Sequence, residues 1–329
     1  MKAYIYNKVW ATLACMATIV ALSATMTGCS GRRSLMPKAG GRPYEVVVAG
    51  DSDSIVYNSL CHPTPALPQT EPMFDVRCIG DNALRGAMAL ARSIVVVSVD
   101  PKQYTRTAVK YERDAYAKGQ IIVYVNSPST QRLRHDMDGS DVVSKLIAAH
   151  ELEVAMAQLR NKHNRKMEDR VRRMFGINMS IPADMTACRE GKGFVWMSNN
   201  SPTAMVNLCI YTSPNRDSVM KTNIKGETDS MWMTTAHTPK PMRHTATDGS
   251  VWTRGLWEMH GDAMGGPFVS RAMHGRGGHS TVVVEAFVYA PGMRKRNLVM
   301  QAEAALHTAT TATTANSTHL THKNTHNTK

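Results

Sequence analysis

The side chains best suited to chemistry lie between Arg254 and Ser270, where a predicted strand runs into a glycine-dense loop. Glu258, His260 and Asp262 occupy alternate positions. Alternate residues of a strand point to the same face, so the three side chains would lie together if the strand continues. Two carboxylates beside an imidazole could transfer protons or hold a metal ion. This trio is the candidate catalytic site of the sequence.

The same stretch also suits a purely structural role, which we favour. Glycines 261, 265 and 266 would supply the positive φ angles of a tight turn that Pro267 ends. The polar trio would then satisfy backbone groups of the loop. The stretch has neither G-x-G-x-x-G nor a glycine-lysine-serine/threonine ending, so it is not predicted to cradle phosphate.

A second motif starts like a zinc-protease signature. His150-Glu151-Leu152-Glu153 matches the beginning of H-E-x-x-H, but Val154 stands where the second histidine ligand belongs. The segment is therefore predicted to be a solvated part of a helix, without metal. His319, His322 and His326 lie near the C-terminus without cysteine or carboxylate, which makes a poor metal site.

The case for an enzyme lacks a nucleophile. No glycine-flanked serine elbow is present, and no catalytic cysteine signature surrounds Cys61 or Cys188. Catalysis is uncertain and disfavoured, and no cofactor is predicted.

A long amphipathic helix is expected from Asp141 to Met174. Its apolar stripe recurs at steps of three and four residues: Val142, Leu146, Ala149, Leu152, Met156, Leu159, His163, Met167, Val171 and Met174. The helix also carries a basic face, formed by Arg160, Lys162, Arg165, Lys166, Arg170, Arg172 and Arg173. A solvated surface is the default interpretation, and docking to anionic lipid or a negatively charged partner is the functional alternative.

The remaining elements predict an α+β fold. Strands are expected at Tyr44–Ala49, Met73–Ile79, Ile94–Val99 and Gln120–Asn126, and the apolar runs among them suit strands covered on both faces. A mainly antiparallel sheet should follow, with strands at Gly193–Ser198, Ala204–Tyr211, Ser250–Met259 and Ser280–Tyr289. A helix over Pro291–His307 closes the globular domain of residues 43–307. Residues 43–140 and 177–307 could form two subdomains joined by the helix over 141–174.

The N-terminus has the layout of an export signal over residues 1–28. Lys2 and Lys8 precede an uncharged stretch that ends at Met26-Thr27-Gly28-Cys29, which resembles the lipobox of bacterial lipoproteins. The uncharged stretch is too rich in threonine and alanine to favour a transmembrane helix. We therefore expect lipidation of Cys29, a flexible tether over residues 29–42, and attachment to a membrane.

Charge, cysteine content and the C-terminal tail set further limits. The net charge of +13 invites a nucleic-acid partner, but an exported protein meets anionic lipids first, so no nucleic acid is predicted. The domain keeps four scattered cysteines, which we expect to be buried free thiols: Cys61, Cys78, Cys188 and Cys209. The threonine- and histidine-rich residues 308–329 are predicted to be disordered.

Four separated motifs carry a resemblance to a known family. They are residues 41–48, residues 67–74, residues 257–270 and residues 285–291. In this order they are similar to an uncharacterised lipoprotein family of Bacteroidota, a DUF4837-like domain of unknown function. The similarity covers Gly41–His307 and brings no established activity.

The resemblance implies a location in the cell envelope. Surface lipoproteins of that phylum carry acidic residues after the cysteine, whereas this tether is basic, so an outer-membrane protein facing the periplasm is expected. Exported proteins of the phylum can also be O-glycosylated in patterns that Ser54, Ser218 and Ser230 match. The predicted function is a binding or scaffold module with an envelope protein or anionic glycolipid as partner. The alternative is an envelope hydrolase or transferase using Glu258, His260 and Asp262.

Overall fold

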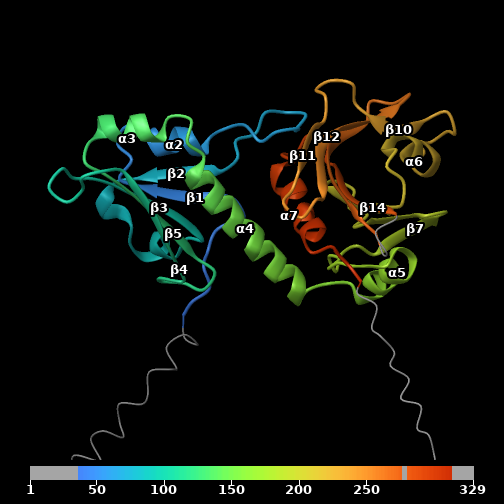
Figure 1. Cartoon of the computed structure of the whole chain (residues 1–329), viewed down its shortest axis with the longest axis horizontal. Coiled ribbons are helices and arrows are strands. Elements are labelled where there is room, and N and C mark those ends of the chain that lie inside the picture. Colours follow the sequence, from blue (N-terminus) through green and yellow to red (C-terminus); the bar gives the residue numbers. More distant parts are fainter. Residues whose placement is uncertain (1–35, 276–279, 313–329) are drawn as a thin grey trace, which may run out of the picture. The chain divides into compact units, whose positions relative to one another are not determined.

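The computed structural model describes residues 36–275 and 280–312 (Figure 1). Within these residues the chain forms two compact units. The first contains the segment up to Asp53 and the segment Arg77–Arg134, and the second contains Ser54–Val76 and the chain from His135 onward. The fold is α+β, as predicted. Among the described residues no helix is both long and apolar enough to cross a membrane.

The elements follow one another along the chain as shown in Figure 1. The helices are α2 (Ile55–Leu60), α3 (Thr130–Met137), α4 (Val142–Asn161), α5 (Arg165–Phe175), α6 (Arg216–Asn223) and α7 (Arg296–His307), with 3-10 helices at Asp81–Ala83 and Gly86–Leu90. The strands up to residue 178 are β1 (Glu45–Ala49), β2 (Asp75–Ile79), β3 (Ser93–Val99), β4 (Ala108–Arg113), β5 (Ile121–Ser127) and β6 (Ile177–Asn178). The later strands are β7 (Ala187–Gly191), β8 (Phe194–Ser198), β9 (Met205–Tyr211), β10 (Trp232–Thr235), β11 (Met242–Thr245), β12 (Val251–His260), β13 (Gly265–His274), β14 (Thr281–Tyr289) and β15 (Thr310–Thr311).

The first unit is built on a five-stranded sheet of order β2-β1-β3-β5-β4. β1 pairs with β3 and β3 with β5 in parallel, and β4 is antiparallel to β5. Val95 and Val123 are completely buried on one face, and Ile94 and Ile122 are buried on the other, which confirms that the apolar runs form strands covered on both faces. β4 was not predicted, because its residues are mostly exposed and show no apolar run.

The predicted tether is partly ordered. Gly40 N donates to Leu90 O at 2.8 Å, and Pro37 O accepts from Lys118 N at 2.8 Å. The chain therefore joins the first unit before Gly41. Residues 1–35, including the predicted signal and Cys29, lie outside the described residues.

The helix predicted over residues 141–174 is two helices, α4 and α5. The break comes at His163 and Asn164. Asn164 begins α5 as its N-cap, with its side chain accepting from Met167 N at 3.3 Å, and His163 forms a bridge to Pro182. The buried stripe of α4 is also rotated from the predicted one, because Val143 and Ile147 are fully buried whereas Val142 is 39% exposed.

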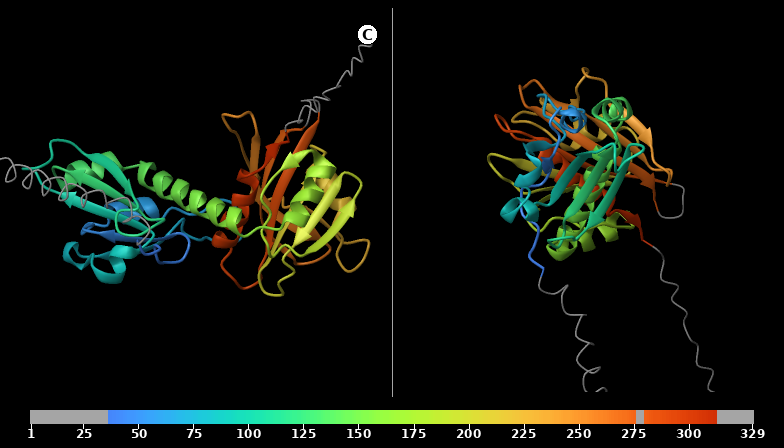
Figure 2. Two further views of the ribbon diagram at one scale, coloured as in Figure 1. Left: turned by 90° about the horizontal axis from the view of Figure 1, so that it is seen from below. Right: turned by 90° about the vertical axis from the view of Figure 1, so that its left-hand side faces the viewer.

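The second unit is built on an eight-stranded antiparallel sheet. Its order is β10-β12-β13-β14-β9-β8-β7, and β11 also pairs with β12. One face packs a core that includes Trp257, Phe268 and Phe287 together with Met220 of α6. On the other face α7 packs along β9, β13 and β14 (Figure 2). The mainly antiparallel sheet with a C-terminal helix is confirmed.

The first residues of the predicted tail are ordered. β15 pairs with β6, so that Thr310 lies opposite Asn178, and Ser180 N donates to Thr308 Oγ1 at 2.8 Å. Threonine suits a paired strand, which explains why the fold extends past His307. The histidines 319, 322 and 326 lie outside the described residues.

Candidate functional site: a pocket above a buried ion pair

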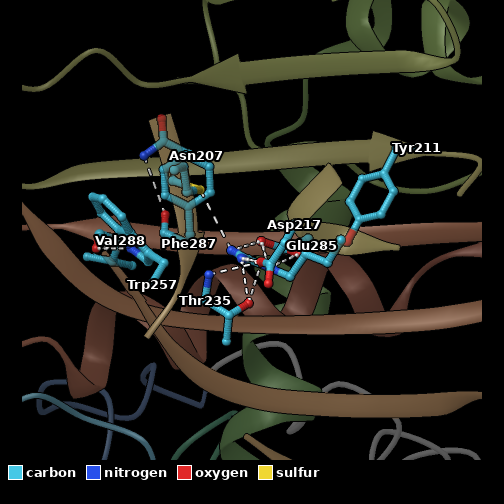
Figure 3. Close-up of polar contacts among 10 residues, drawn as sticks. Asn207, Tyr211, Asp217, Thr235, Trp257, Glu285, Phe287 and Val288 are labelled. Carbon is cyan, nitrogen blue, oxygen red and sulfur yellow. Dashed lines mark hydrogen bonds and ion pairs between the residues drawn. The ribbon is translucent and has the colours of Figure 1, made fainter. Parts of the chain in front are cut away.

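The centre of the candidate site is the carboxylate of Glu285 on β14, which is completely buried. Arg216 Nη2 donates to its Oε1 at 2.8 Å, and Arg216 Nε donates to both of its oxygens at 3.0 and 3.1 Å. Tyr211 donates its hydroxyl to Oε2 at 2.9 Å. A buried charge must be paired and hydrogen-bonded, and Glu285 meets both conditions (Figure 3).

Arg216 is held by its surroundings as well as by Glu285. Its guanidinium lies over the ring of Phe268, 4.0 Å from the centroid, and Nη1 donates to Thr235 Oγ1 at 3.1 Å. Asp217 Oδ1 accepts from Thr235 N at 2.9 Å and from its hydroxyl at 2.7 Å (Figure 3). Asn215 caps the first turn of α6 by accepting from Ser218 N. These hydrogen bonds hold the start of α6 against β10 and β14.

The burial and charge of this cluster shift its pKa values. Burial alone would lower the pKa of Arg216, but the nearby charge of Glu285 outweighs burial and raises it. Burial and then the Glu285 charge raise the pKa of Tyr211 well above its ordinary value, and the same two causes raise the pKa of the Cys209 thiol. Arg216 is therefore permanently charged, and Tyr211 stays a neutral hydrogen-bond donor.

A cavity of about 720 Å³ lies on this face of the sheet. Its walls come from the β9–α6 connection, the β10–β11 connection and strands of the sheet: Tyr211, Pro214, Asn215, Arg216, Asp217, Thr235, Lys240, Pro241, Arg243, Thr253, Phe268, Ser270, Ala272 and Val283. Ligand pockets commonly enclose about 300–1,000 Å³ and are mostly apolar with a few polar groups. The cavity, called the sheet pocket below, fits that description.

The trio predicted as a catalytic site lies elsewhere. Glu258 and His260 share a face of β12, and both are exposed. His260 stacks on Trp232 with ring centroids 4.0 Å apart, whereas Asp262 lies in the turn after the strand and its Oδ1 accepts from Ala263 N at 2.6 Å. In the described part of the chain no group of three or more histidine, cysteine or acidic side chains could hold a metal ion.

The predicted glycine loop is mostly a strand. Gly261 does turn the chain with a positive φ of 83°, but Gly265, Gly266 and Pro267 belong to β13. A Cβ on Gly266 would lie 2.0 Å from Val288 O, so glycine is needed there for the close approach of two backbones. The prediction that these glycines supply positive φ is wrong for 265 and 266.

The segment that begins like a zinc-protease signature lies on α4. His150 and Glu151 are buried at 3% and 2% exposure, so the prediction of a solvated segment is wrong. They lie on the buried side of α4 together with Val143 and Ile147. This side is rotated by about one residue from the apolar stripe that the sequence predicts.

The predicted basic face divides between the two helices. Arg160 lies in the last turn of α4, and Lys162 is the exposed C-cap of the same helix. Arg165, Lys166 and Arg173 are exposed on α5, and Arg172 pairs with Asp169 at 2.5 Å. Arg170 instead turns to β7, where it contacts Glu190 Oε1 at 3.0 Å and Cys188 Sγ at 3.0 Å.

The four cysteines of the described residues are free. Cys209 is buried, Cys61 and Cys188 are partly buried, and Cys78 is exposed. Burial is therefore confirmed for Cys209 and wrong for Cys78. Ser54, Ser218 and Ser230, the predicted glycosylation acceptors, are all exposed.

The residues of the sheet pocket were not predicted from the sequence. Arg216 and Glu285 are 69 positions apart, and no spacing pattern connects them. One signal was available: Glu285 is the sole charged residue in the run TVVVEAFVY, and a charge within a buried strand needs a partner.

The fold and the site together define an α+β protein whose second unit carries a pocket above a buried ion pair. Residues 164–308 match a family described as Domain of unknown function (DUF4837), and residues 39–160 match one described as Domain of unknown function (DUF8532). The resemblance to an uncharacterised DUF4837-like family is thus confirmed.

No curated protein matches the chain. Among solved structures, the chain is similar to a crystal structure from Bacteroides thetaiotaomicron with 17% sequence identity and a TM-score of 0.19. That match covers 42% of this chain and 46% of the other.

Proposed function

We propose that this chain is a lipid-anchored protein of the bacterial cell envelope that binds a small ligand in the sheet pocket. The observation that carries the ligand-binding role is a cavity of about 720 Å³ with a floor made rigid by the Arg216–Glu285 pair. A preorganised, mostly pre-formed cavity is the usual form of a small-molecule site.

The chemistry of the pocket supports binding over catalysis. Both oxygens of Glu285 accept hydrogen bonds from Arg216, and Arg216 is only 12% exposed. A carboxylate that is buried and fully paired cannot take a proton from a substrate in the cavity. The pair therefore serves to shape the floor of the pocket.

Purification from the native cell tests the ligand-binding role. The full chain would be isolated with Cys29 intact, and small molecules extracted from it would be measured by mass spectrometry. We expect a molecule in near-stoichiometric amount that is lost in Ala272→Phe, which fills the cavity, and kept in Ala272→Ser. Equal yields from both variants, or no molecule with the wild type, would overturn the proposal.

Membrane attachment is supported by the sequence around Cys29, which follows two small residues and an uncharged stretch. Phase separation in a cloud-point detergent is a direct test. The wild-type chain should enter the detergent phase, and Cys29→Ser should not. If both distribute alike, Cys29 does not carry the anchor. The basic tether favours the periplasmic side of the outer membrane.

The basic face of α5 is proposed as a second contact surface, for an envelope protein or an anionic glycolipid. The supporting observation is that Arg165, Lys166 and Arg173 are all exposed on one short helix. We expect Arg165→Glu, Lys166→Glu, Arg172→Glu and Arg173→Glu together to abolish a cross-linked partner seen with the wild type in native cells. An unchanged cross-linking pattern would exclude this surface.

A further inference from the structure

The charges inside the sheet pocket are largely satisfied by one another. Arg216 uses Nε and Nη2 for Glu285 and Nη1 for Thr235 and Asp217. Asp217 Oδ1 also accepts from the backbone and the hydroxyl of Thr235. Arg216 neutralises Glu285, and the remaining carboxylate of Asp217 is 3.3 Å from Arg216 Nη1. These groups therefore leave one negative charge in the pocket.

Lys240 and Arg243 are the cations left for a ligand. Lys240 lines the pocket from the β10–β11 connection and Arg243 lines it from β11, and both are exposed. Within residues 36–275 and 280–312, neither forms an ion pair or a side-chain hydrogen bond. An ammonium group and a guanidinium on one wall attract an oxyanion, and the guanidinium can bind it with two hydrogen bonds.

The rest of the wall is suited to hydrocarbon. Pro214 is exposed and Pro241 and Ala272 are partly exposed in the wall, whereas Phe268 and Val283 are almost completely buried. A ligand that carried only charge would leave the apolar surface of Pro214, Pro241 and Ala272 in contact with water. Burying apolar area contributes roughly 25 cal/mol for each Å², so an apolar ligand body is favoured.

Resting on the ligand-binding role proposed above, we propose that the sheet pocket takes a small amphiphile with a carboxylate or phosphate head, held by Lys240 and Arg243. Its apolar body lies against Pro214, Pro241 and Ala272. A cationic head is disfavoured because Arg216 neutralises Glu285, and Lys240 and Arg243 together outweigh the single negative charge of Asp217.

A series of probes with one chain length and different heads tests the proposal. Octanoate, octyl phosphate, octanol and octylammonium would be titrated into the full chain by calorimetry. We expect at least one of the two anions to bind tenfold or more tightly than octanol, and octylammonium to bind most weakly. The ratio between octanoate and octyl phosphate then identifies the head group.

Charge reversal identifies the residues responsible. Lys240→Glu with Arg243→Glu should weaken the tighter anion at least tenfold and leave octanol unchanged. The matched control is Lys102→Glu with Arg106→Glu, which makes the same charge change at two exposed residues of the β3–β4 connection in the first unit. A loss of anion affinity in the control as large as in the pocket variant would overturn the assignment to Lys240 and Arg243.

The remaining outcomes separate this inference from the proposed function. If octanol or octylammonium binds as tightly as the anions and Ala272→Phe blocks all of them, the pocket is a ligand site but the anionic head is wrong. If none of the four binds, the amphiphile class is wrong, and the molecule extracted from the native protein decides the ligand-binding role by itself.

Discussion

At the scale of single residues, Glu285 and Arg216 form the polar interaction whose loss should cost most. Removing one partner of a buried ion pair leaves the other charge uncompensated, which typically costs about 3–5 kcal/mol. Glu285→Gln should therefore lower the free energy of unfolding by roughly this amount, measured by urea denaturation.

A double variant separates the ion pair from simple packing. Arg216→Met combined with Glu285→Gln removes both charges, and replacing both partners of a buried pair is often close to neutral. We expect the double variant to be more stable than Glu285→Gln alone. If the double variant loses as much unfolding free energy as Arg216→Met and Glu285→Gln lose together, or more, Arg216 and Glu285 do not stabilise each other.

Gly266 offers a second test at this scale. Its Cβ position is 2.0 Å from Val288 O and 3.1 Å from Trp257 Nε1, so alanine forces the backbones of β13 and β14 apart. Overpacking of this kind costs about 1–3 kcal/mol or more. Gly80→Ala is the matched control, because nothing lies within 4 Å of its Cβ position, and it should stay within about 0.5 kcal/mol of the wild type. Equal melting temperatures for the two variants would contradict the close approach.

At the scale of elements, α7 is tied to β12 by the ion pair between Glu303 and Arg254. Burial alone would raise the pKa of Glu303, but the Arg254 charge and His307 outweigh it and lower the pKa from its ordinary value of 4.5. A lowered carboxyl pKa stabilises the fold above the unfolded pKa, and this contribution is lost as the pH falls through the folded pKa.

Glu303→Gln should therefore lose about 1–3 kcal/mol of unfolding free energy at pH 7 and much less at pH 3. Urea denaturation at a series of pH values between 3 and 7 measures this convergence. Glu227→Gln, on an exposed loop, should have the same unfolding free energy as the wild type at every pH. If the difference in unfolding free energy between wild type and Glu303→Gln stays constant from pH 3 to pH 7, the ionised pair is not the cause of that difference.

Elements also show what the sequence could and could not predict. Strands with apolar runs, such as β3 and β5, were found because burial on both faces leaves a continuous pattern. β13 was not predicted because Gly265-Gly266-Pro267 has the composition of a turn. Glycine is required at 266 because the backbone of Val288 on the neighbouring strand approaches it closely. The sheet pocket was not predicted either, because its walls come from segments spread between residues 211 and 283 that no spacing pattern connects.

At the scale of the whole molecule, the compact units and the family matches divide the chain differently. The DUF8532 match covers residues 39–160, yet residues 54–76 within it belong to the second unit. The reason is visible at the start of α7. Glu71 accepts from the backbone of Lys295 at 2.6 Å and of Arg296 at 3.1 Å, and thus caps a helix more than 200 residues away.

The side chain of Arg296 completes this attachment. It is 3% exposed, and its Nη1 donates to Pro72 O at 3.1 Å and to Met73 O at 2.8 Å, while Nη2 pairs with Asp75. Without residues 54–76 the first turn of α7 would lose its cap, and a buried guanidinium would lose its acceptors. The segment is therefore part of the folding unit that contains the DUF4837 match.

The contribution of residues 54–76 to the stability of the second unit can be measured by adding them as a separate peptide. A fragment of residues 135–312 should melt at a higher temperature when a peptide of residues 54–76 is added, because the peptide binds only the folded form. The same peptide with Glu71→Ala should raise the melting temperature less, since loss of a helix cap costs about 0.5–2 kcal/mol. If neither peptide changes the melting temperature, the second unit is complete without residues 54–76, and its boundary coincides with the family match.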